Sequence, residues 1–188
     1  MQTALLIIDM QNDFVLPGAP ARIAGAQATV GRIAEVLTYF RSRALPVFHV
    51  IRAYRADGSD IEISRRAAFL AGPQYVVPGT KGAAIVAELT PAKNEYQIVK
   101  PRFSAFFGTE LELLLRRLGV ERLVICGTQY PNCIRATAFD GLALGYDTTI
   151  LTDGTSAASE EIAAANIRDL RNVGIRCLSF ADYQTPQA

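Results

Sequence analysis

Three residues with complementary chemistry stand where short apolar runs of the sequence end. Asp9 directly follows the run 4–8, Lys100 follows the run 96–99, and Cys133 comes a few residues after the run 122–126. A thiol, a carboxylate and an ammonium group suffice for nucleophilic catalysis, because the carboxylate can accept the thiol proton and later deliver it to a leaving amine. These residue types therefore indicate Cys133 as a nucleophile with Asp9 and Lys100 beside it.

The sequence around Cys133 predicts that its sulfur lies at the start of a helix. Pro131 suits a first helical turn, and an apolar stripe follows at Ile134, Ala138 and Leu142. The partial positive charge and free amides of a helix N-terminus favour the thiolate and can bind a developing oxyanion. A neighbouring lysine acts in the same direction. We therefore expect the Cys133 thiol to be ionised or nearly so.

Each of these residues also has a purely structural explanation. A cysteine in a first helical turn often only packs, an aspartate at a strand end is often a turn former or cap, and Lys100 could be a surface charge. Three such residues at three strand ends of one sheet favour the functional interpretation. Cys126 and Cys177 lie inside apolar runs, so we expect both to be buried core thiols.

The elements that must position these residues alternate between strands and helices. Apolar runs without alternation predict six buried parallel strands, at 3–8, 45–51, 96–99, 122–126, 148–151 and 176–180. Helical spacing is clearest in the stripe formed by Val30, Ile33, Leu37 and Phe40, and further helices are expected at about 109–118 and from about 159. The pattern predicts one α/β domain over residues 1–188, with helices on both faces of the sheet.

In a doubly wound sheet, ligands bind outside the carboxyl ends of the strands. The three residues singled out above should therefore meet at one edge. Segment 52–91 is rich in turn signals, and we expect it to pass over the sheet and help to roof a pocket. No G-x-G-x-x-G follows the first strand, which argues against nucleotide binding.

Composition narrows the range of partners. The 188 residues carry 19 basic and 18 acidic side chains with no long run of one sign, so nucleic acid and anionic membranes are not expected partners. Apolar runs stay short of the roughly 18 to 20 residues that a membrane span needs, and the N-terminus lacks the pattern of a signal peptide. We expect a cytoplasmic protein with a small-molecule substrate, which forms a homo-oligomer, a dimer or tetramer.

Three motifs, at 6–14, 100–109 and 127–146, resemble those of the isochorismatase-like cysteine hydrolase superfamily. That superfamily includes nicotinamidases, carbamoylsarcosine and ureidoacrylate amidohydrolases, and isochorismatases. The resemblance implies a three-layer Rossmann-like fold, the catalytic triad Asp9, Lys100 and Cys133, and a covalent acyl intermediate without any cofactor. It also implies a cis peptide between Thr128 and Gln129, with the Gln129 and Cys133 amides forming the oxyanion hole.

Departures from the superfamily pattern refine this expectation. Isochorismatases lack the nucleophilic cysteine, so Cys133 favours an amide or ureide over an isochorismate-like vinyl ether. Nicotinamidases carry an aspartate and paired histidines as metal ligands after the second strand, whereas residues 50–55 here hold no such set and His49 is the sole histidine. We therefore expect no metal site, and we interpret His49 as a core residue. Tyr130 stands where relatives often have threonine, which predicts a reshaped pocket.

Small planar amides are usually held by aromatic walls and a few directed polar groups. Candidate substrate contacts are Phe14, Tyr54, Arg102, Phe107 and Tyr130. Arg102 would suit a substrate carboxylate, with an exposed salt bridge as the equally weighted alternative. The predicted function is cysteine-dependent hydrolysis of a small amide or ureide. The alternatives are hydrolysis of an ester or vinyl ether, and a non-catalytic thiol sensor or binding protein on the same fold.

Overall fold

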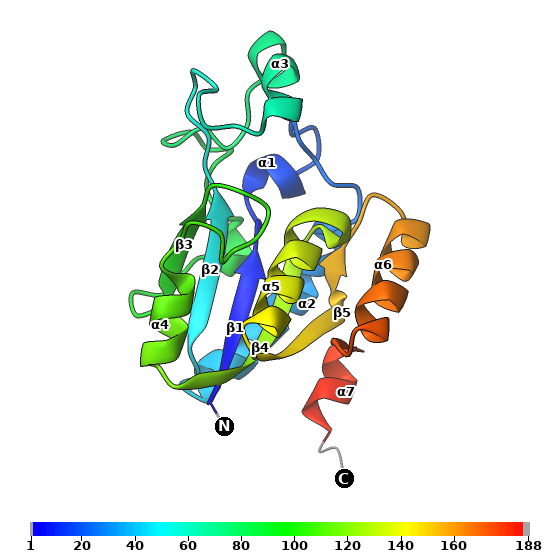
Figure 1. Cartoon of the computed structure of the whole chain (residues 1–188). Coiled ribbons are helices and arrows are strands. Elements are labelled where there is room, and N and C mark those ends of the chain that lie inside the picture. The colour runs from blue at the N-terminus through cyan, green and yellow to red at the C-terminus, as the bar shows by residue number, and fades with distance from the viewer. Residues whose placement is uncertain (1, 186–188) are drawn as a thin grey trace.

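The computed structural model describes residues 2–185 and contains a six-stranded, all-parallel sheet (Figure 1). Its strands are β1 (Gln2–Ile8), β2 (Val47–Arg52), β3 (Tyr96–Lys100), β4 (Val120–Thr128), β5 (Asp147–Ser156) and β6 (Arg176–Leu178), and their spatial order is β3-β2-β1-β4-β5-β6. The order reverses between β1 and β4, which is the kind of switch point where such sheets bind ligands. The predicted Rossmann-like α/β fold is confirmed.

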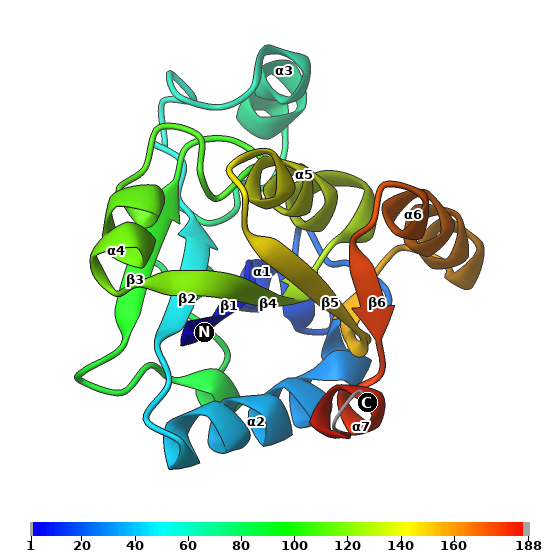
Figure 2. The same ribbon diagram turned by 60° about the horizontal axis from the view of Figure 1, so that its bottom comes forward.

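Helices cover both faces of the sheet (Figure 2). The helices are α1 (Asn12–Val15), α2 (Ala26–Ser42), α3 (Ile63–Ala71), α4 (Leu111–Arg117), α5 (Arg135–Ala143), α6 (Glu160–Asn172) and α7 (Phe180–Gln184), with a 3-10 turn η1 (Ala87–Leu89) and a π-helical turn η2 (Tyr130–Ile134). One core cluster packs α4, α5 and α6 against the sheet, and a second packs α2 and α7 against the other face. The stripe of α2 predicted from the sequence lies in the second cluster, fully or almost fully buried.

Several element boundaries differ from the sequence-based expectation. The predicted sixth strand 176–180 ends at Leu178, because Ser179 caps α7 through a hydrogen bond that its Oγ accepts from the Asp182 amide at 3.1 Å. The fifth strand continues to Ser156, well past the apolar run. The helix expected from about 159 is α6, and Ser159 caps it, since its Oγ accepts from the Ile162 amide.

A glycine allows β4 to run beside β1 as far as the site. Gly127 has a φ of 116°, and a Cβ at this position would lie 2.1 Å from the Ile8 carbonyl oxygen. No residue with a side chain fits both the conformation and the space. Gly127 pairs with Ile8, so this close approach stands directly before Asp9 and the loop that leads to Cys133.

The segment between β2 and β3 rises above the carboxyl ends of the strands and includes the projecting helix α3 (Figure 1). Residues just after Asp9 tie it down. Gln11 Nε2 donates to the Ala83 carbonyl at 2.8 Å, and Asp13 Oδ2 accepts from the Val76 amide at 2.6 Å. A Cβ on Gly82 would lie 2.1 Å from the Asp13 carboxylate oxygens, so a larger residue here would displace that carboxylate. The motif after β1 therefore holds the roof of the site in place.

Within residues 2–185, the structure contains no helix that is both long and apolar enough to cross a membrane.

Candidate active site

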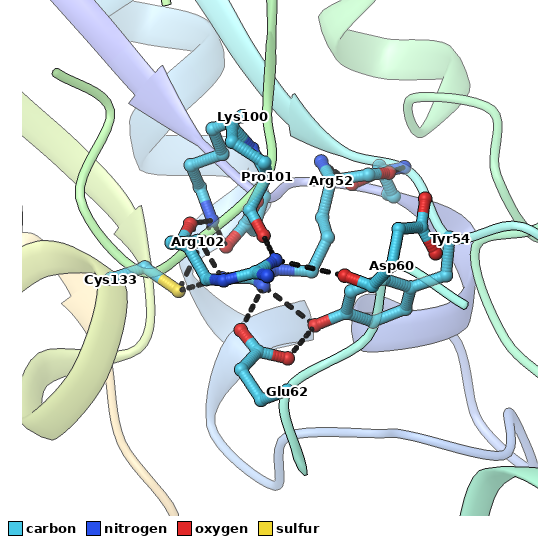
Figure 3. A network of polar contacts seen from close by, with 10 residues as sticks. Arg52, Tyr54, Asp60, Glu62, Lys100, Pro101, Arg102 and Cys133 are labelled. Atoms are coloured by element: carbon cyan, nitrogen blue, oxygen red, sulfur yellow. Dashed lines mark hydrogen bonds and ion pairs between the residues drawn. The ribbon is translucent and has the colours of Figure 1, made fainter. Parts of the chain in front are cut away.

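Asp9, Lys100 and Cys133 meet at the carboxyl edge of the sheet. Figure 3 shows Lys100 beside the Cys133 sulfur. Lys100 Nζ lies 2.8 Å from Asp9 Oδ2 and 3.3 Å from Cys133 Sγ, so the ammonium group links the other two residues. Lys100 is fully buried, and the exposed fraction of the Asp9 side chain is 3%. The sheet brings together residues that are more than 120 positions apart in the sequence.

The backbone of Asp9 is specialised for its position. Its φ is +54°, a left-handed conformation that is uncommon for a residue with a side chain, and its amide donates to the Val50 carbonyl at 2.8 Å. Oδ2 is taken up by Lys100, whereas Oδ1 is buried and has no hydrogen-bond partner within residues 2–185. The carboxylate therefore retains an oxygen that can accept a proton.

Cys133 lies within the π-helical turn η2, directly before α5, rather than at the start of a regular α-helix. Pro131 occupies the first turn as predicted, and the Ile134 amide reaches back to the Gln129 carbonyl at 3.3 Å. The peptide bond between Thr128 and Gln129 is cis. The Cys133 sulfur in this π-turn lies 3.3 Å from Lys100 Nζ, and such turns are frequent at functional sites.

The Cys133 thiol is not prepared for spontaneous ionisation, contrary to the sequence-based expectation. Burial raises the pKa of the thiol, and the neighbouring Asp9 carboxylate raises it further, while Lys100 and Arg52 oppose both effects. The sulfur is almost enclosed, with 7% of the residue exposed. Burial and Asp9 therefore disfavour a resting thiolate, and Asp9 is a carboxylate close enough to accept the thiol proton.

A cavity of about 290 Å³ opens beside the sulfur. Its lining is a mixture of catalytic candidates, aromatic and aliphatic walls and polar groups: Asp9, Phe14, Pro20, Ala21, Ile23, Arg52, Arg65, Tyr75, Thr128, Gln129, Asn132 and Cys133. The roof supplies Arg65 and Tyr75, as expected for the segment after β2. Of the five substrate contacts predicted from the sequence, Phe14 lies on this cavity.

Two of the other predicted contacts lie behind the cavity wall. The Tyr54 hydroxyl accepts from Arg52 and donates to Glu62 Oε2, each at 2.6 Å, so it supports the wall instead of facing the substrate. The Arg102 guanidinium donates to the Asp60 carbonyl at 2.8 Å and to its neighbour's carbonyl. Both carbonyls use Nη1, Arg102 does not line the cavity, and no carboxylate within residues 2–185 forms the alternative salt bridge with it.

The remaining two predicted contacts do not line the cavity either. Tyr130 is fully buried in the core cluster that contains α5 and α6, so it fills the interior and does not narrow the pocket. Phe107 is 63% exposed and lies by a separate surface hollow with Glu112 and Asp140. Sequence position near a strand end did not reveal which way these two side chains point.

Sequence reasoning missed Arg52, the cavity residue that lies against the sulfur, as well as the lining residues Arg65, Tyr75 and Asn132. Arg52 is the last residue of β2 and pairs in register with Lys100, the last residue of β3. Its Nη2 lies 3.6 Å from Cys133 Sγ, and 1% of the residue is exposed. The only available signal was its place after an apolar run, the same signal that identified Asp9 and Lys100.

A metal centre is not assembled by the residues that follow β2. Arg52, Tyr54 and Glu62 bond to one another there, and within residues 2–185 no three His, Cys, Asp or Glu side chains are grouped so as to hold an ion. His49 is buried in the sheet, and its Nε2 lies 2.9 Å from Glu95 Oε2. Burial lowers the pKa of His49, partly offset by Glu95, as befits a core residue.

Comparison with known proteins supports the resemblance that the motifs suggested. Residues 3–182 match the model of the isochorismatase domain. An isochorismatase family protein from Desulfovibrio vulgaris has a solved structure that is 54% identical, covers 97% of this chain and 96% of its own, and superposes with a TM-score of 0.94.

Curated relatives differ in what is said of their activity. A protein of Arabidopsis thaliana named a probable inactive nicotinamidase is 45% identical over 93% of this chain and 90% of its own length. A ureidoacrylate amidohydrolase of Azorhizobium caulinodans is 29% identical over 85% and 78%, respectively. The family model spans nearly the whole chain, and the chain therefore belongs to the isochorismatase family of hydrolases.

Proposed function

We propose that this protein hydrolyses the carbon–nitrogen bond of a small amide or ureide, with Cys133 as the nucleophile. The observation that carries the proposal is the Lys100 ammonium, which links Asp9 and Cys133 on the floor of a cavity. A buried lysine between an acid and a thiol is costly to maintain for stability alone. Its position supports a role in proton transfer and charge stabilisation.

The reaction begins with transfer of the thiol proton from Cys133 Sγ to Asp9 Oδ1. The sulfur electron pair then forms a bond to the substrate carbonyl carbon, and the carbonyl oxygen becomes an oxyanion. In the proposal the amides of Gln129 and Cys133 donate to this oxyanion. The proton on Asp9 passes to the leaving nitrogen as the carbon–nitrogen bond breaks, which leaves a thioester on Cys133.

Water completes the cycle. Asp9 takes a proton from a water molecule while the water oxygen attacks the thioester carbon. The carbon–sulfur bond then breaks, and Asp9 returns the proton to the sulfur. Lys100 keeps its charge throughout and stabilises Asp9 and the sulfur in turn. These steps need no cofactor, because every proton and electron pair is supplied by the chain, the substrate or water.

The size and lining of the cavity favour a small substrate. Its volume of about 290 Å³ is at the lower end of the range of roughly 300–1,000 Å³ found for small-molecule sites. Phe14 and Tyr75 pack edge to face with ring centroids 6.0 Å apart and together form an aromatic wall, and Gln129 and Asn132 offer polar contacts in the same cavity. This arrangement suits a compact planar amide or ureide.

A panel of primary amides, ureides, esters and an isochorismate-like vinyl ether, assayed for ammonia or product release, tests the proposal. We expect turnover of amides or ureides by the wild type, none by Cys133→Ala, and unchanged turnover by the control Cys177→Ala, which removes a buried thiol in β6. Retained amide hydrolysis in Cys133→Ala would reject the mechanism. Turnover confined to the esters or the vinyl ether would reject the substrate class.

A second candidate function is a non-catalytic protein that binds a small molecule or senses oxidants through Cys133. The name of the 45% identical relative favours it. In that case peroxide would convert Cys133 to a sulfenic acid while no member of the panel is consumed. Mass spectrometry of the Cys133 peptide, run beside the panel, separates the two functions.

A further inference from the structure

Arg52 places a second positive charge on the reactive sulfur. Its Nη2 lies 3.6 Å from Cys133 Sγ, close to the 3.3 Å that separates the sulfur from Lys100 Nζ. The residue is 1% exposed and still lines the cavity. The β2–β3 register sets Arg52 directly beside Lys100, so the two cations approach the thiol from neighbouring strand ends.

The Arg52 backbone is held by one side chain. Gln11 Oε1 accepts from the Arg52 amide and Gln11 Nε2 donates to the Arg52 carbonyl, both at 2.8 Å. Gln11 itself is completely buried. Because both polar groups of the Arg52 backbone are fixed in this way, the end of β2 has little freedom to move away from the sulfur.

The guanidinium is held just as firmly (Figure 3). Nη1 lies 2.6 Å from the Tyr54 hydroxyl and 2.5 Å from Glu62 Oε1, and Nη2 donates to the Arg102 carbonyl at 2.8 Å. One hydrogen of Nη2 is used by that carbonyl, which leaves the other for the sulfur. A planar group bonded along one side presents its remaining donor in one direction.

Proton transfer from the thiol to Asp9 changes which anions the two neighbouring cations face. Before transfer, Lys100 pairs with Asp9 and Arg52 pairs with Glu62, on either side of a neutral thiol. Transfer of the proton to Asp9 neutralises the partner of Lys100 and creates a buried thiolate. At that moment Lys100 and Arg52 both face a single new anion, and a buried anion needs such partners.

We propose that Arg52 is a further catalytic residue of this hydrolase, the second cation on the Cys133 thiolate, with Glu62 and Tyr54 as its positioning residues. The proposal rests on the proposed function. Arg52 exchanges no proton or electron: the thiol proton moves from Sγ to Asp9 Oδ1, and the guanidinium donates a hydrogen bond to the sulfur until the carbon–sulfur bond forms. It donates again when that bond breaks.

The charge of Glu62 limits the effect of Arg52 on the sulfur. Burial opposes ionisation of Glu62, but the Tyr54 hydrogen bond and the Arg52 charge lower the pKa of this carboxyl below its usual value, so it is charged at neutral pH. Removing the charge of Arg52 should therefore disfavour the thiolate, whereas removing the charge of Glu62 should favour it. If Arg52 and Glu62 had only a structural role, their substitution would not shift the pKa of the Cys133 thiol in opposite directions.

The test is the pH dependence of Cys133 alkylation by iodoacetamide, which needs no substrate. Peptide mapping assigns the label to Cys133 rather than to Cys126 or Cys177. For Arg52→Gln we expect a midpoint at higher pH and a rate at pH 7 at least about tenfold lower, as one pKa unit implies. For Glu62→Gln the midpoint should move to lower pH.

Arg102→Gln is the matched control, because it keeps the backbone carbonyl that holds Arg52 and alters a guanidinium outside the cavity. Its midpoint should equal that of the wild type. Arg52→Lys keeps the charge and should fall between the wild type and Arg52→Gln. If Arg52→Gln does not fold, the opposite shifts expected for Glu62→Gln and Arg52→Lys still decide the matter.

Unchanged midpoints in the Arg52 variants, or shifts of the same sign in the Arg52 and Glu62 variants, would overturn the proposal. Amide turnover, measured on the same proteins, separates this failure from failure of the proposed function. Where amides are hydrolysed but the midpoints do not move, Arg52 alone is rejected. Where the midpoints move as expected but no panel member is hydrolysed, the proposed function is rejected, and with it the catalytic role of Arg52.

Discussion

Lys100→Met removes the cation that neutralises Asp9 inside the protein. The two side chains form an ion pair of 2.8 Å with exposed fractions of 0% and 3%. Removing one partner of a buried pair typically costs about 3–5 kcal/mol of folding free energy, because the other charge is left uncompensated. Arg52 retains its charge near Asp9, so we expect the lower end of this range, about 3 kcal/mol.

The double variant Asp9→Asn/Lys100→Met provides the decisive comparison. It leaves no isolated charge, so its loss of stability should be less than about 2 kcal/mol and well below the sum of the two single losses. Urea unfolding at pH 7 followed by circular dichroism measures all four proteins, since the chain has no tryptophan. All three variants should lack hydrolysis. Additive losses, or a loss below about 1 kcal/mol for Lys100→Met, would refute the assigned pairing.

Three further predictions concern the scaffold and the pocket. Gly127→Ala should cost more than about 3 kcal/mol in urea unfolding, whereas Gly18→Ala, with a positive φ but open space, should cost about 1 kcal/mol; equal losses would contradict the assigned close approach. Although burial opposes ionisation, hydrogen bonds chiefly from Arg41 lower the pKa of Glu95 to about 2, below its unfolded value of about 4.5. This stability is fully present above about pH 4.5 and is lost as the pH falls toward 2, so Glu95→Gln should be less stable by about 2–4 kcal/mol at pH 7 but not near pH 2. Within the described residues, no carboxylate pairs with the cavity-lining Arg65. Arg65→Gln should therefore raise KM for carboxylate-bearing ureides more than for neutral ones. Equal changes in KM for both kinds of substrate would argue against a contact between Arg65 and the substrate carboxylate.

The fold was predictable because its central strands carry apolar runs that are buried on both faces, whereas the edge strands β3 and β6 are partly exposed. Runs such as 4–8 and 122–126 reveal their burial directly, and the stripe on α2 reveals the face that packs on the sheet. Boundaries were less accessible, since the end of β6 is set by the cap at Ser179 and the far end of β5 lies beyond its apolar run. Local capping and strand pairing there override the hydrophobic pattern.

The site was predictable in its positions but not in its side-chain directions. Asp9, Lys100 and Cys133 were found because a strand end is a backbone property that the sequence pattern reveals. Arg52 stands at an equivalent position, but an arginine after a strand is usually a surface residue. Tyr54 and Glu62 hold its guanidinium inside, and Gln11, which comes from another strand end, fixes its backbone. The directions of Tyr130 and Phe107 depend on neighbours that are distant in the sequence.

The pKa of the Cys133 thiol is a further property that depends on side-chain surroundings the sequence pattern does not reveal. The sequence places a lysine and a helix start near Cys133, both of which favour a thiolate, but it does not reveal how deeply the sulfur is buried. Burial and Asp9 raise the pKa of the thiol, which alters the expected resting state of the thiol but not the proton transfer to Asp9 that the sequence suggested. The cysteine depends on its base for activation instead of resting as a thiolate.

The most direct test of the central claim is to trap the covalent intermediate. The wild type is mixed with an amide or ureide that it hydrolyses, quenched in acid during turnover, digested and analysed by mass spectrometry. We expect the acyl group of the substrate on the peptide that carries Cys133 and on neither of the peptides that carry Cys126 and Cys177. An acyl group on another residue, or sustained hydrolysis by a protein that lacks the Cys133 sulfur, would contradict the account.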